Sequence, residues 1–176
     1  MSDKPKLLAI SSPGGHWIQL NRLSSALENR YQIVYAMPAA LFTSTTLSER
    51  ATEHKEQSTT VTERSRSERA TERKVYSVMD VSADDKWRLI PCALQVLYIL
   101  LKERPQAILS TGAAPGAVAI WLGSFLGIRT IWVDSIANVK HISRAGKLAQ
   151  KRADVFLTQW EHLSNGQDIL FKGAVL

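Results

Sequence analysis

The sequence predicts an α/β fold, with a doubly wound, mostly parallel sheet that carries helices on both faces. Short apolar runs alternate with longer helical patterns along the chain, and this alternation is typical of a parallel sheet. The runs are apolar throughout, as expected for strands that are covered on both faces. With 176 residues, 45% of them hydrophobic, the chain is predicted to form one domain over residues 1–176.

In chain order, each apolar run predicts a strand and each longer periodic run predicts a helix. We expect strands at residues 6–11, 32–37, 74–78, 107–110, 130–134 and 155–158. We expect helices at residues 17–29, 85–103, 115–126 and 144–152. In the common strand order 3-2-1-4-5, the first and fourth strands are neighbours where the winding reverses, and ligands bind at their carboxyl ends.

Two glycine-bearing loops follow the first and fourth of these strands, at residues 11–16 and 110–116. Small residues let the backbone turn sharply into a helix, whose free N–H groups and positive dipole end form an anion site, typically for phosphate. Because the strand order brings both loops together, we expect a ligand with more than one charged group. The predicted ligand-binding residues in the loops are Ser12, Gly14, Gly15, Thr111, Gly112, Ala113 and Gly116.

Residues 43–73 do not fit this pattern, because they contain almost no large apolar side chains and are rich in Glu, Arg, Ser and Thr. The sequence SERATE at 48–53 recurs at 67–72, but neither copy carries a face to bury. Like-charged i,i+4 pairs such as Glu49 and Glu53 weaken a helix. We interpret residues 43–73 as a mobile, solvated insertion; a flap that covers the substrate is the alternative.

Several function classes lack their sequence signals. The first loop does not have the G-x-G-x-x-G spacing of a dinucleotide site, and the G-x-x-x-x-G-K-[ST] motif of P-loop NTPases is absent. The net charge of +6 indicates an anionic partner, but the basic residues are spread out, so nucleic acid is not predicted. A single Cys92 excludes a disulfide framework, and the cytosol is the expected compartment.

Polar residues at the carboxyl ends of the strands are the candidate chemical groups. His16 closes the first loop, where an imidazole can act as a general base towards a sugar hydroxyl or hold a diphosphate. A helix-capping role is the alternative for His16. Asp134, Ser135 and Asn138 follow the fifth strand, and a carboxylate there can accept a hydroxyl proton. A simple turn is the alternative for these three, since Asp, Ser and Asn are common loop formers.

Residues 86–104 combine an apolar stretch with flanking cations and a tryptophan. Lys86, Trp87 and Arg88 precede the apolar run at 89–101, and Lys102 follows it. This pattern is typical of a helix that lies in a membrane interface, and equally of a buried helix that covers a sheet. The apolar run is too short to span a bilayer, and the first residues of the chain lack the apolar region of a signal peptide.

Four motifs stand in order along the chain: SSPGGH at 11–16, STGAAPG at 110–116, WVDSIAN at 132–138 and LTQW at 157–160. Together they resemble bacterial exopolysaccharide glycosyltransferase subunits. Those subunits belong with the anchor subunit of the two-part N-acetylglucosaminyltransferase of dolichol-linked oligosaccharide assembly. More distantly, the Gly-Gly-His loop resembles that of the peptidoglycan N-acetylglucosaminyltransferase that acts on lipid I. The resemblance covers most of the chain apart from residues 43–73.

The resemblance implies the amino-terminal, Rossmann-like half of a GT-B glycosyltransferase. In such enzymes this half binds the acceptor, here a polyprenyl-diphosphate-linked sugar, and the other half binds a UDP-sugar donor. As the chain has the length of one half, we expect the donor half on a partner subunit. The implied mechanism has loop amides that hold the diphosphate, His16 or Asp134 as the base that deprotonates the acceptor hydroxyl, and inversion at the anomeric carbon.

Cofactors, location and alternatives complete the expectations. Neither a metal ion nor another cofactor is expected, because no D-x-D sequence is present to hold a divalent cation on the diphosphate. The expected location is cytoplasmic, peripheral on the inner face of the cytoplasmic membrane, where the apolar helix and basic charge dock on anionic lipid. Two other functions stay open: a non-catalytic scaffold that recruits and activates a catalytic partner at the membrane, and a stand-alone enzyme that acts on phosphosugars or nucleotides.

Overall fold

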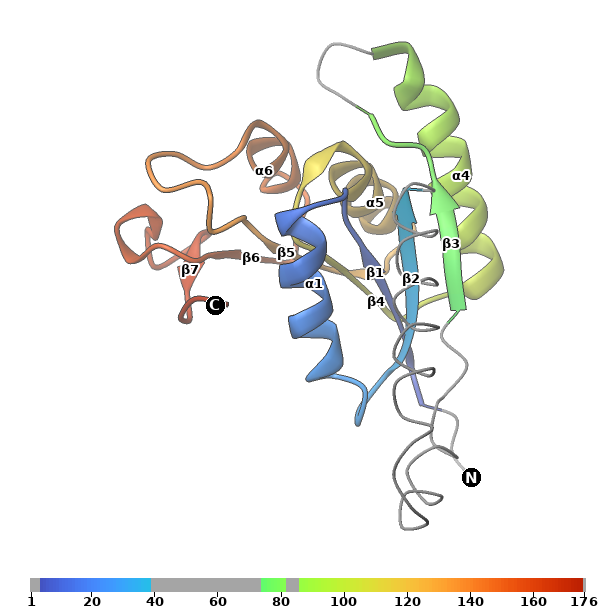
Figure 1. Cartoon of the computed structure of the whole chain (residues 1–176), viewed down its shortest axis with the longest axis horizontal. Coiled ribbons are helices and arrows are strands. Elements are labelled where there is room, and N and C mark those ends of the chain that lie inside the picture. Colours follow the sequence, from blue (N-terminus) through green and yellow to red (C-terminus); the bar gives the residue numbers. More distant parts are fainter. Residues whose placement is uncertain (1–3, 39–73, 82–85, 176) are drawn as a thin grey trace, which may run out of the picture.

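A seven-stranded parallel sheet runs through the residues that the computed structural model describes, namely 4–38, 74–81 and 86–175 (Figure 1). The strand order is β3-β2-β1-β4-β5-β6-β7, and every neighbouring pair is parallel. The first and fourth strands are neighbours, so the predicted doubly wound order is confirmed. The insertion predicted at residues 43–73 lies outside the described residues.

The strands are β1 Lys6–Ile10, β2 Gln32–Pro38, β3 Lys74–Val78, β4 Ala107–Ser110, β5 Arg129–Val133, β6 Val155–Thr158 and β7 Leu170–Phe171. The helices are α1 Gly15–Ser25, α4 Leu89–Glu103, α5 Ala113–Phe125 and α6 Arg144–Ala149, with short 3-10 turns η1 Lys86–Arg88 and η2 Glu161–Leu163. All six predicted strands are present. The two-residue strand β7 is not among the predictions, because so short a pairing leaves no periodic pattern.

The helix boundaries differ more from the sequence predictions than the strand boundaries do. Helix α1 begins at Gly15 and α5 at Ala113, two residues earlier than residues 17 and 115, where they are predicted to begin. The residues at these starts include glycines, which have a low helix propensity, so the sequence pattern predicts the helices to begin later than they do. The earlier starts matter for function, because they place the first helical turns directly at the ends of β1 and β4.

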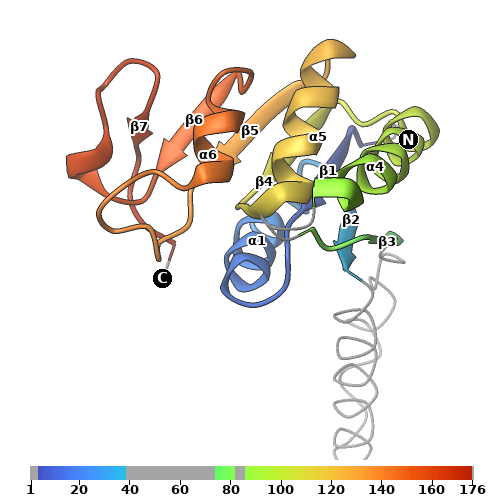
Figure 2. The same ribbon diagram turned by 90° about the horizontal axis from the view of Figure 1, so that it is seen from above.

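Helices cover both faces of the sheet, with α1 on one side and α4, α5 and α6 on the other (Figure 2). Successive strand side chains point to opposite faces. Accordingly, Leu7 of β1 belongs to the apolar cluster that contains Leu20 of α1. Leu8 belongs to the other cluster, with Val96 of α4 and Ile120 of α5. This two-sided burial explains why the strand sequences are apolar throughout.

The amino edge of the sheet is held by a buried carboxylate at the end of α4. Glu103 is only 3% exposed and accepts hydrogen bonds from Lys6 Nζ at 2.8 Å, Tyr76 Oη at 2.5 Å and Lys74 Nζ at 3.3 Å. The bonds from Lys6, Tyr76 and Lys74 lower the pKa of Glu103 to about 2, against the opposing effect of burial. The cluster ties α4 to β1 and β3.

Candidate functional site

The two glycine-bearing loops meet at the carboxyl edge of the sheet. Ile10 of β1 pairs with Ser110 of β4, so these two strands end side by side. His16 Nδ1 donates to the Thr111 carbonyl oxygen at 2.9 Å, and Thr111 Oγ1 donates to the His16 carbonyl oxygen at 2.7 Å. These reciprocal hydrogen bonds join the loops, and the prediction that they come together is confirmed.

The contact with Thr111 fixes the tautomer of the His16 ring. A carbonyl oxygen can only accept, so Nδ1 carries the proton in this arrangement. In the neutral imidazole, Nε2 therefore has a lone pair. Nε2 has no hydrogen-bond partner within the described part of the chain, and the residue is half-buried. His16 thus presents the acceptor nitrogen that a general base requires.

Backbone conformation at the second loop is matched to the His16 ring. Gly112 has a φ of 148°, and a Cβ at this position would overlap the His16 imidazole. Glycine is therefore required both by conformation and by space. The next residue, Ala113, has a φ of 64°, a left-handed conformation that costs a residue with a side chain about 1–3 kcal/mol and is often found at functional sites.

Helices α1 and α5, which begin directly after β1 and β4, both lack a side-chain cap. The N-cap residues are Gly14 for α1 and Gly112 for α5, and neither first turn contains an acidic residue. Helix α6 differs, because Ser143 Oγ accepts a hydrogen bond from Gly146 N at 2.8 Å. Uncapped N–H groups and the positive end of the helix dipole together favour an anion. The ends of β1 and β4 therefore carry two neighbouring anion-binding positions.

Asp134 lies at the end of β5 and is almost completely buried, at 2% exposure. Its Oδ1 accepts hydrogen bonds from Trp132 Nε1 at 3.1 Å and Ser143 Oγ at 2.7 Å. Its Oδ2 accepts hydrogen bonds from Asn138 Nδ2 at 3.1 Å and Ser143 N at 3.1 Å. Both oxygens are thus engaged in shaping the loop before α6. This geometry favours a loop-holding role, and the catalytic role of Asp134 stays a prediction.

The other predicted binding residues differ in accessibility. Gly14 and Gly15 are exposed, and Ala113 is half-buried. Ser12 and Ser135 are buried to 8% and 5% exposure at the ends of their strands. Ser135 Oγ accepts a hydrogen bond from the Ala137 N–H at 3.3 Å. In the first loop, the backbone at Gly14 and Gly15 is therefore more accessible to a ligand than the Ser12 side chain.

Thr111 and Gly116 have packing roles that the sequence does not reveal. Thr111 is 0% exposed, and its hydroxyl and carbonyl both bond to His16. Gly116 is buried, and a Cβ there would overlap Ser110 Oγ and crowd the Trp132 ring. Gly116 thus lets α5 approach β4 closely. Direct contact of these two residues with a ligand stays a prediction that the packing does not favour.

A comparison with protein families decides the family. The model described as "Oligosaccharide biosynthesis protein Alg14 like" matches residues 7–174. The chain belongs to this family. Two curated relatives of this Alg14-like chain are fungal proteins described as "UDP-N-acetylglucosamine transferase subunit ALG14", both from Cryptococcus neoformans var. neoformans serotype D.

The relative from strain JEC21 is 34% identical over 95 residues, which are 48% of this chain and 41% of the relative. The relative from strain B-3501A is 40% identical over 48 residues, which are 27% of this chain and 21% of the relative. The aligned part is thus less than half the length of either curated relative. Since both are fungal, they do not support the bacterial exopolysaccharide part of the resemblance.

Solved structures share the fold. The crystal structure of Acinetobacter baumannii MurG superposes with a TM-score of 0.65 at 10% identity, over 97% of this chain and 45% of that chain. UDP-N-acetylglucosamine 2-epimerase from Rickettsia bellii superposes with a TM-score of 0.64 at 13% identity, over 97% of this chain and 45% of that chain. At these identities the likeness concerns the fold alone, and it confirms the predicted Rossmann-like α/β fold.

Two glutamines of this Alg14-like chain belong to the carboxyl edge but are not among the predicted site residues. Gln19 of α1 and Gln159 after β6 are 6% and 4% exposed, and their side chains are joined at 2.7 Å. A weak signal was present in the sequence, because Gln19 follows His16 by three positions and so lies on the same face of a helix. Gln159 lies in the LTQW motif.

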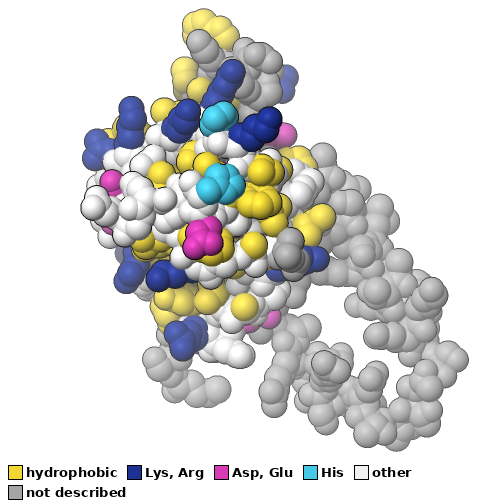
Figure 3. Space-filling view, turned by 90° about the vertical axis from the view of Figure 1, so that its left-hand side faces the viewer, with side chains coloured by type: hydrophobic (Ala, Val, Ile, Leu, Met, Phe, Trp, Pro, Cys, Tyr) yellow, Lys and Arg dark blue, Asp and Glu magenta, His cyan; other side chains and the backbone are white. Residues whose placement is uncertain are grey.

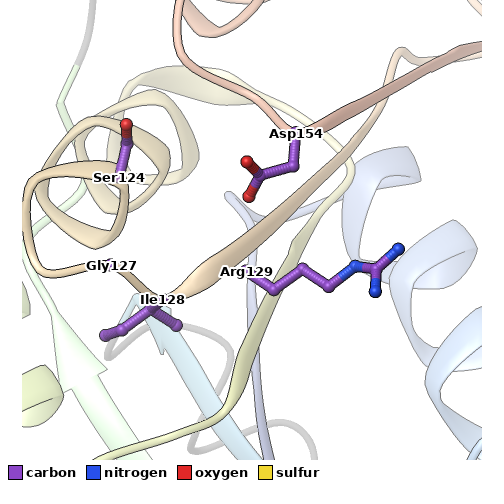
Figure 4. A pocket seen from close by; sticks show the side chains of 5 residues that line it. All are labelled: Ser124, Gly127, Ile128, Arg129 and Asp154. Carbon is purple, nitrogen blue, oxygen red and sulfur yellow. The ribbon is translucent and has the colours of Figure 1, made fainter.

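A hollow of about 400 Å³ lies at the opposite edge of the sheet (Figure 4). It is lined by Ser124, Gly127, Ile128, Arg129 and Asp154. Asp154 Oδ2 accepts hydrogen bonds from Thr130 N at 2.6 Å and Thr130 Oγ1 at 2.9 Å, and the Arg129 side chain extends away from that carboxylate (Figure 4). None of the predicted site residues lines the hollow, and the Asp154 carboxylate is already hydrogen-bonded to Thr130.

Helix α4 has two apolar faces. Its inner face is buried in the core and includes Cys92, where burial raises the pKa of the thiol to about 11. Its outer stripe and the preceding turn have exposed fractions of 56% to 87%, at Trp87, Ile90, Leu94, Tyr98 and Leu101. The buried inner face confirms that α4 covers the sheet, and membrane contact by its outer stripe stays a prediction. Among the described residues, no helix has the length and apolar character needed to cross a bilayer.

The side of the molecule near α6 carries exposed basic residues. Lys140, Arg144 and Lys147 are exposed on the loop after β5 and on α6. Figure 3 views the molecule from this side, where Lys and Arg side chains gather along the upper rim. Within the described ranges, salt bridges join Lys6 and Lys74 to Glu103, and none involves Lys140, Arg144 or Lys147. Positive charge is therefore available near the carboxyl edge.

Proposed function

We propose that this chain is the acceptor-binding subunit of a two-part glycosyltransferase. It binds a polyprenyl-diphosphate-linked sugar, and a partner subunit that carries the donor half supplies a UDP-sugar. The observation that carries the proposal is the pair of adjacent, uncapped helix N-termini with His16 between them. Each N-terminus favours one anionic group, and a diphosphate presents two neighbouring phosphates.

The proposed donor is UDP-N-acetylglucosamine, because both fungal relatives are described as subunits of a transferase of that sugar nucleotide. His16 Nε2 takes the proton of the acceptor hydroxyl while the hydroxyl oxygen forms a bond to the anomeric carbon of the donor sugar. The bond from that carbon to the diphosphate oxygen breaks, and UDP leaves with the electron pair. A direct displacement of this kind inverts the anomeric carbon, and a positioned base contributes about 10²–10⁴-fold to such a step.

The acceptor contacts are assigned by their place at the edge. The backbone around Gly14, Gly15 and Ala113 binds the diphosphate, since these helix starts are accessible. Ser12, Ser135 and Asn138 are proposed contacts on the sugar side, and Asp134 holds the loop that carries two of them.

The exposed stripe of α4 is the proposed membrane contact on the inner face of the cytoplasmic membrane. Helix α4 begins beyond the end of β3, at the same edge of the sheet as the uncapped helices (Figure 1). Docking through Trp87, Ile90 and Leu94 therefore brings the carboxyl edge close to a lipid-linked acceptor. An apolar helical face with basic flanks is suited to such an interface, and the basic rim near α6 adds attraction to anionic lipid.

The test is a transfer assay with the chain co-purified with its donor-half subunit. The substrates are UDP-N-acetylglucosamine and farnesyl-diphosphate-linked N-acetylglucosamine. His16→Ala is expected to lower kcat at least about 100-fold while the complex still forms. His141→Ala, which changes an exposed histidine on the loop after β5, serves as the matched control and is expected to retain full activity.

A non-catalytic recruiting scaffold is the second candidate, because the exposed stripe of α4 favours membrane docking by itself. Full transfer by the His16→Ala complex would overturn the chemical role and favour the scaffold. Turnover by the purified chain without a second subunit would instead indicate a stand-alone enzyme.

A further inference from the structure

The amide pair of Gln19 and Gln159 links elements that are far apart in sequence. Gln19 Oε1 accepts hydrogen bonds from Ile136 N at 3.4 Å and from Gln159 Nε2 at 2.7 Å. Gln159 Nε2 also donates to the Asp134 carbonyl oxygen at 2.9 Å, and Gln159 Oε1 accepts from Val175 N at 2.8 Å. The pair thus joins α1, the loop after β5 and the segment after β6.

Backbone partners fix which end of each amide points where. A backbone N–H can only donate and a carbonyl oxygen can only accept, so neither amide can be turned over without opposing like groups. At this junction Gln19 must therefore supply an oxygen and Gln159 must supply an N–H group. The two glutamines have different chemical requirements although they are the same residue type.

The pair acts on the same turn of α1 that carries the candidate base. His16 and Gln19 are three residues apart, so they lie on one helical face. His16 is bonded to the loop after β4, and Gln19 is bonded to the loop after β5. Trp160 Nε1 adds a hydrogen bond to the Ile136 carbonyl oxygen at 2.8 Å. The start of α1 is thus connected to three strand-end loops.

We propose that Gln19 and Gln159 are positioning residues, which hold residues 134–138 at a fixed place relative to His16 Nε2. Ser135 and Asn138 on that loop are proposed acceptor contacts, so the kinetic part of this inference rests on the proposed function. A buried amide network is rigid when each of its members is satisfied, and it fails when one donor is replaced by an acceptor. A misplacement of about 1 Å at such a site costs roughly 10²-fold in rate.

The sharpest experiment makes the same substitution at both partners. Gln19→Glu keeps an oxygen for the Ile136 N–H and for Gln159 Nε2. Gln159→Glu instead places an oxygen against Gln19 Oε1 and the Asp134 carbonyl oxygen. In the co-purified complex, Gln19→Glu is expected to retain kcat/KM for farnesyl-diphosphate-linked N-acetylglucosamine within about 3-fold, whereas Gln159→Glu lowers it at least about 30-fold with the donor KM unchanged.

Hydrogen exchange of the chain alone provides a readout that does not depend on catalysis. Amide exchange at residues 135–138 is expected to accelerate about 10-fold or more in Gln159→Glu and in Gln19→Met, which removes the oxygen but keeps the chain length. It is expected to stay slow in Gln19→Glu. Exchange in β1 and α4 controls for global unfolding, and is expected to match the wild type in all three variants.

Three results would overturn the inference: equal effects of the two Gln→Glu substitutions, unchanged exchange at residues 135–138 in Gln159→Glu, or loss of acceptor binding in Gln19→Glu alone. The last result would mean that the Gln19 amide hydrogens contact the ligand directly. If His16→Ala retains full transfer while the exchange pattern holds, the proposed function fails and the positioning geometry stands.

Discussion

The two edges of the same sheet are built in opposite ways. At the amino edge, Glu103 is buried with two lysines and a tyrosine around it, and Asp154 is bonded to Thr130. At the carboxyl edge, α1 and α5 start without side-chain caps, and Ala113 has a left-handed backbone. At the amino edge, the carboxylates of Glu103 and Asp154 are bonded within the protein. The carboxyl edge also contains bonded groups such as Asp134, but it leaves the N–H groups at the starts of α1 and α5 and the Nε2 of His16 available.

This difference separates stability from function within one sheet. Polar groups satisfied within the protein contribute to folding, whereas uncapped helix starts and backbone strain lower stability and are retained where a ligand binds. Substitutions at the amino edge should therefore change unfolding without changing chemistry. Substitutions at the carboxyl edge should change chemistry, and those that relieve backbone strain there should also raise the free energy of unfolding.

The largest effect is expected for Gly112→Ala, because its Cβ would overlap the His16 ring. Transfer by the complex should fall about 100-fold or more, since the base is displaced. Gly127→Ala is the control for a positive φ, here 69°, at a position where an added Cβ meets nothing within 4 Å. Gly112, with a φ of 148° and a ψ of −175°, lies in a region that is almost confined to glycine, so its backbone penalty is the larger of the two. Gly127→Ala should lose about 1 kcal/mol of unfolding free energy and keep full activity. Equal transfer activity of the two variants would contradict the claim that the space at Gly112 positions the His16 ring for catalysis.

At the amino edge, Glu103→Gln should lower the free energy of unfolding by about 3 kcal/mol at pH 7 without lowering kcat. Because the folded pKa of Glu103 is lowered from 4.5 to about 2, this stabilisation is complete above pH 4.5 and is lost as the pH falls towards 2. Urea unfolding across this range should show wild type and variant converging in acid. Glu161→Gln, an exposed site, is the control and should change little. A constant difference down to pH 2 would contradict the assignment.

The outer stripe of α4 adds a membrane test. Leu94→Asp changes a side chain that is 63% exposed, so folding should be unaffected. Binding to phosphatidylglycerol-containing vesicles, measured by co-sedimentation, should weaken about 10-fold or more, as expected for loss of a buried leucine. Ile18→Asp alters an equally apolar residue, 56% exposed on α1, and should bind as the wild type. The reverse ranking would place the membrane contact on the other face of the sheet.

The smallest effect concerns backbone strain at the start of α5. Ala113→Gly should raise the free energy of unfolding by about 0.5–1 kcal/mol, because glycine adopts a φ of 64° freely. Ala114→Gly, in the helical position next along the chain, should lower it by about 0.5–1 kcal/mol. Thermal or urea unfolding distinguishes the signs, and a loss in both variants would show that Ala113 is not strained.

Much of this arrangement follows from the sequence alone. Apolar strands and glycine loops predict both the strand order and the meeting of the loops that contain Gly15 and Gly112. The bonding of Asp134 and the pairing of Gln19 with Gln159 could not be predicted in the same way. These contacts join residues without a shared period, in the second case 140 positions apart, and only the folded topology brings them together.

The central claim is that the carboxyl edge binds a diphosphate. The most direct measurement is an amide NMR titration of the whole chain with farnesyl diphosphate. We predict concentration-dependent shifts at Gly14, Gly15, Ala113 and Ala114, together with the His16 ring, and none around Glu103. Two results would contradict the account. One is shifts confined to the hollow at residues 124–129, and the other is no shift at the starts of α1 and α5 when farnesyl diphosphate is in large excess.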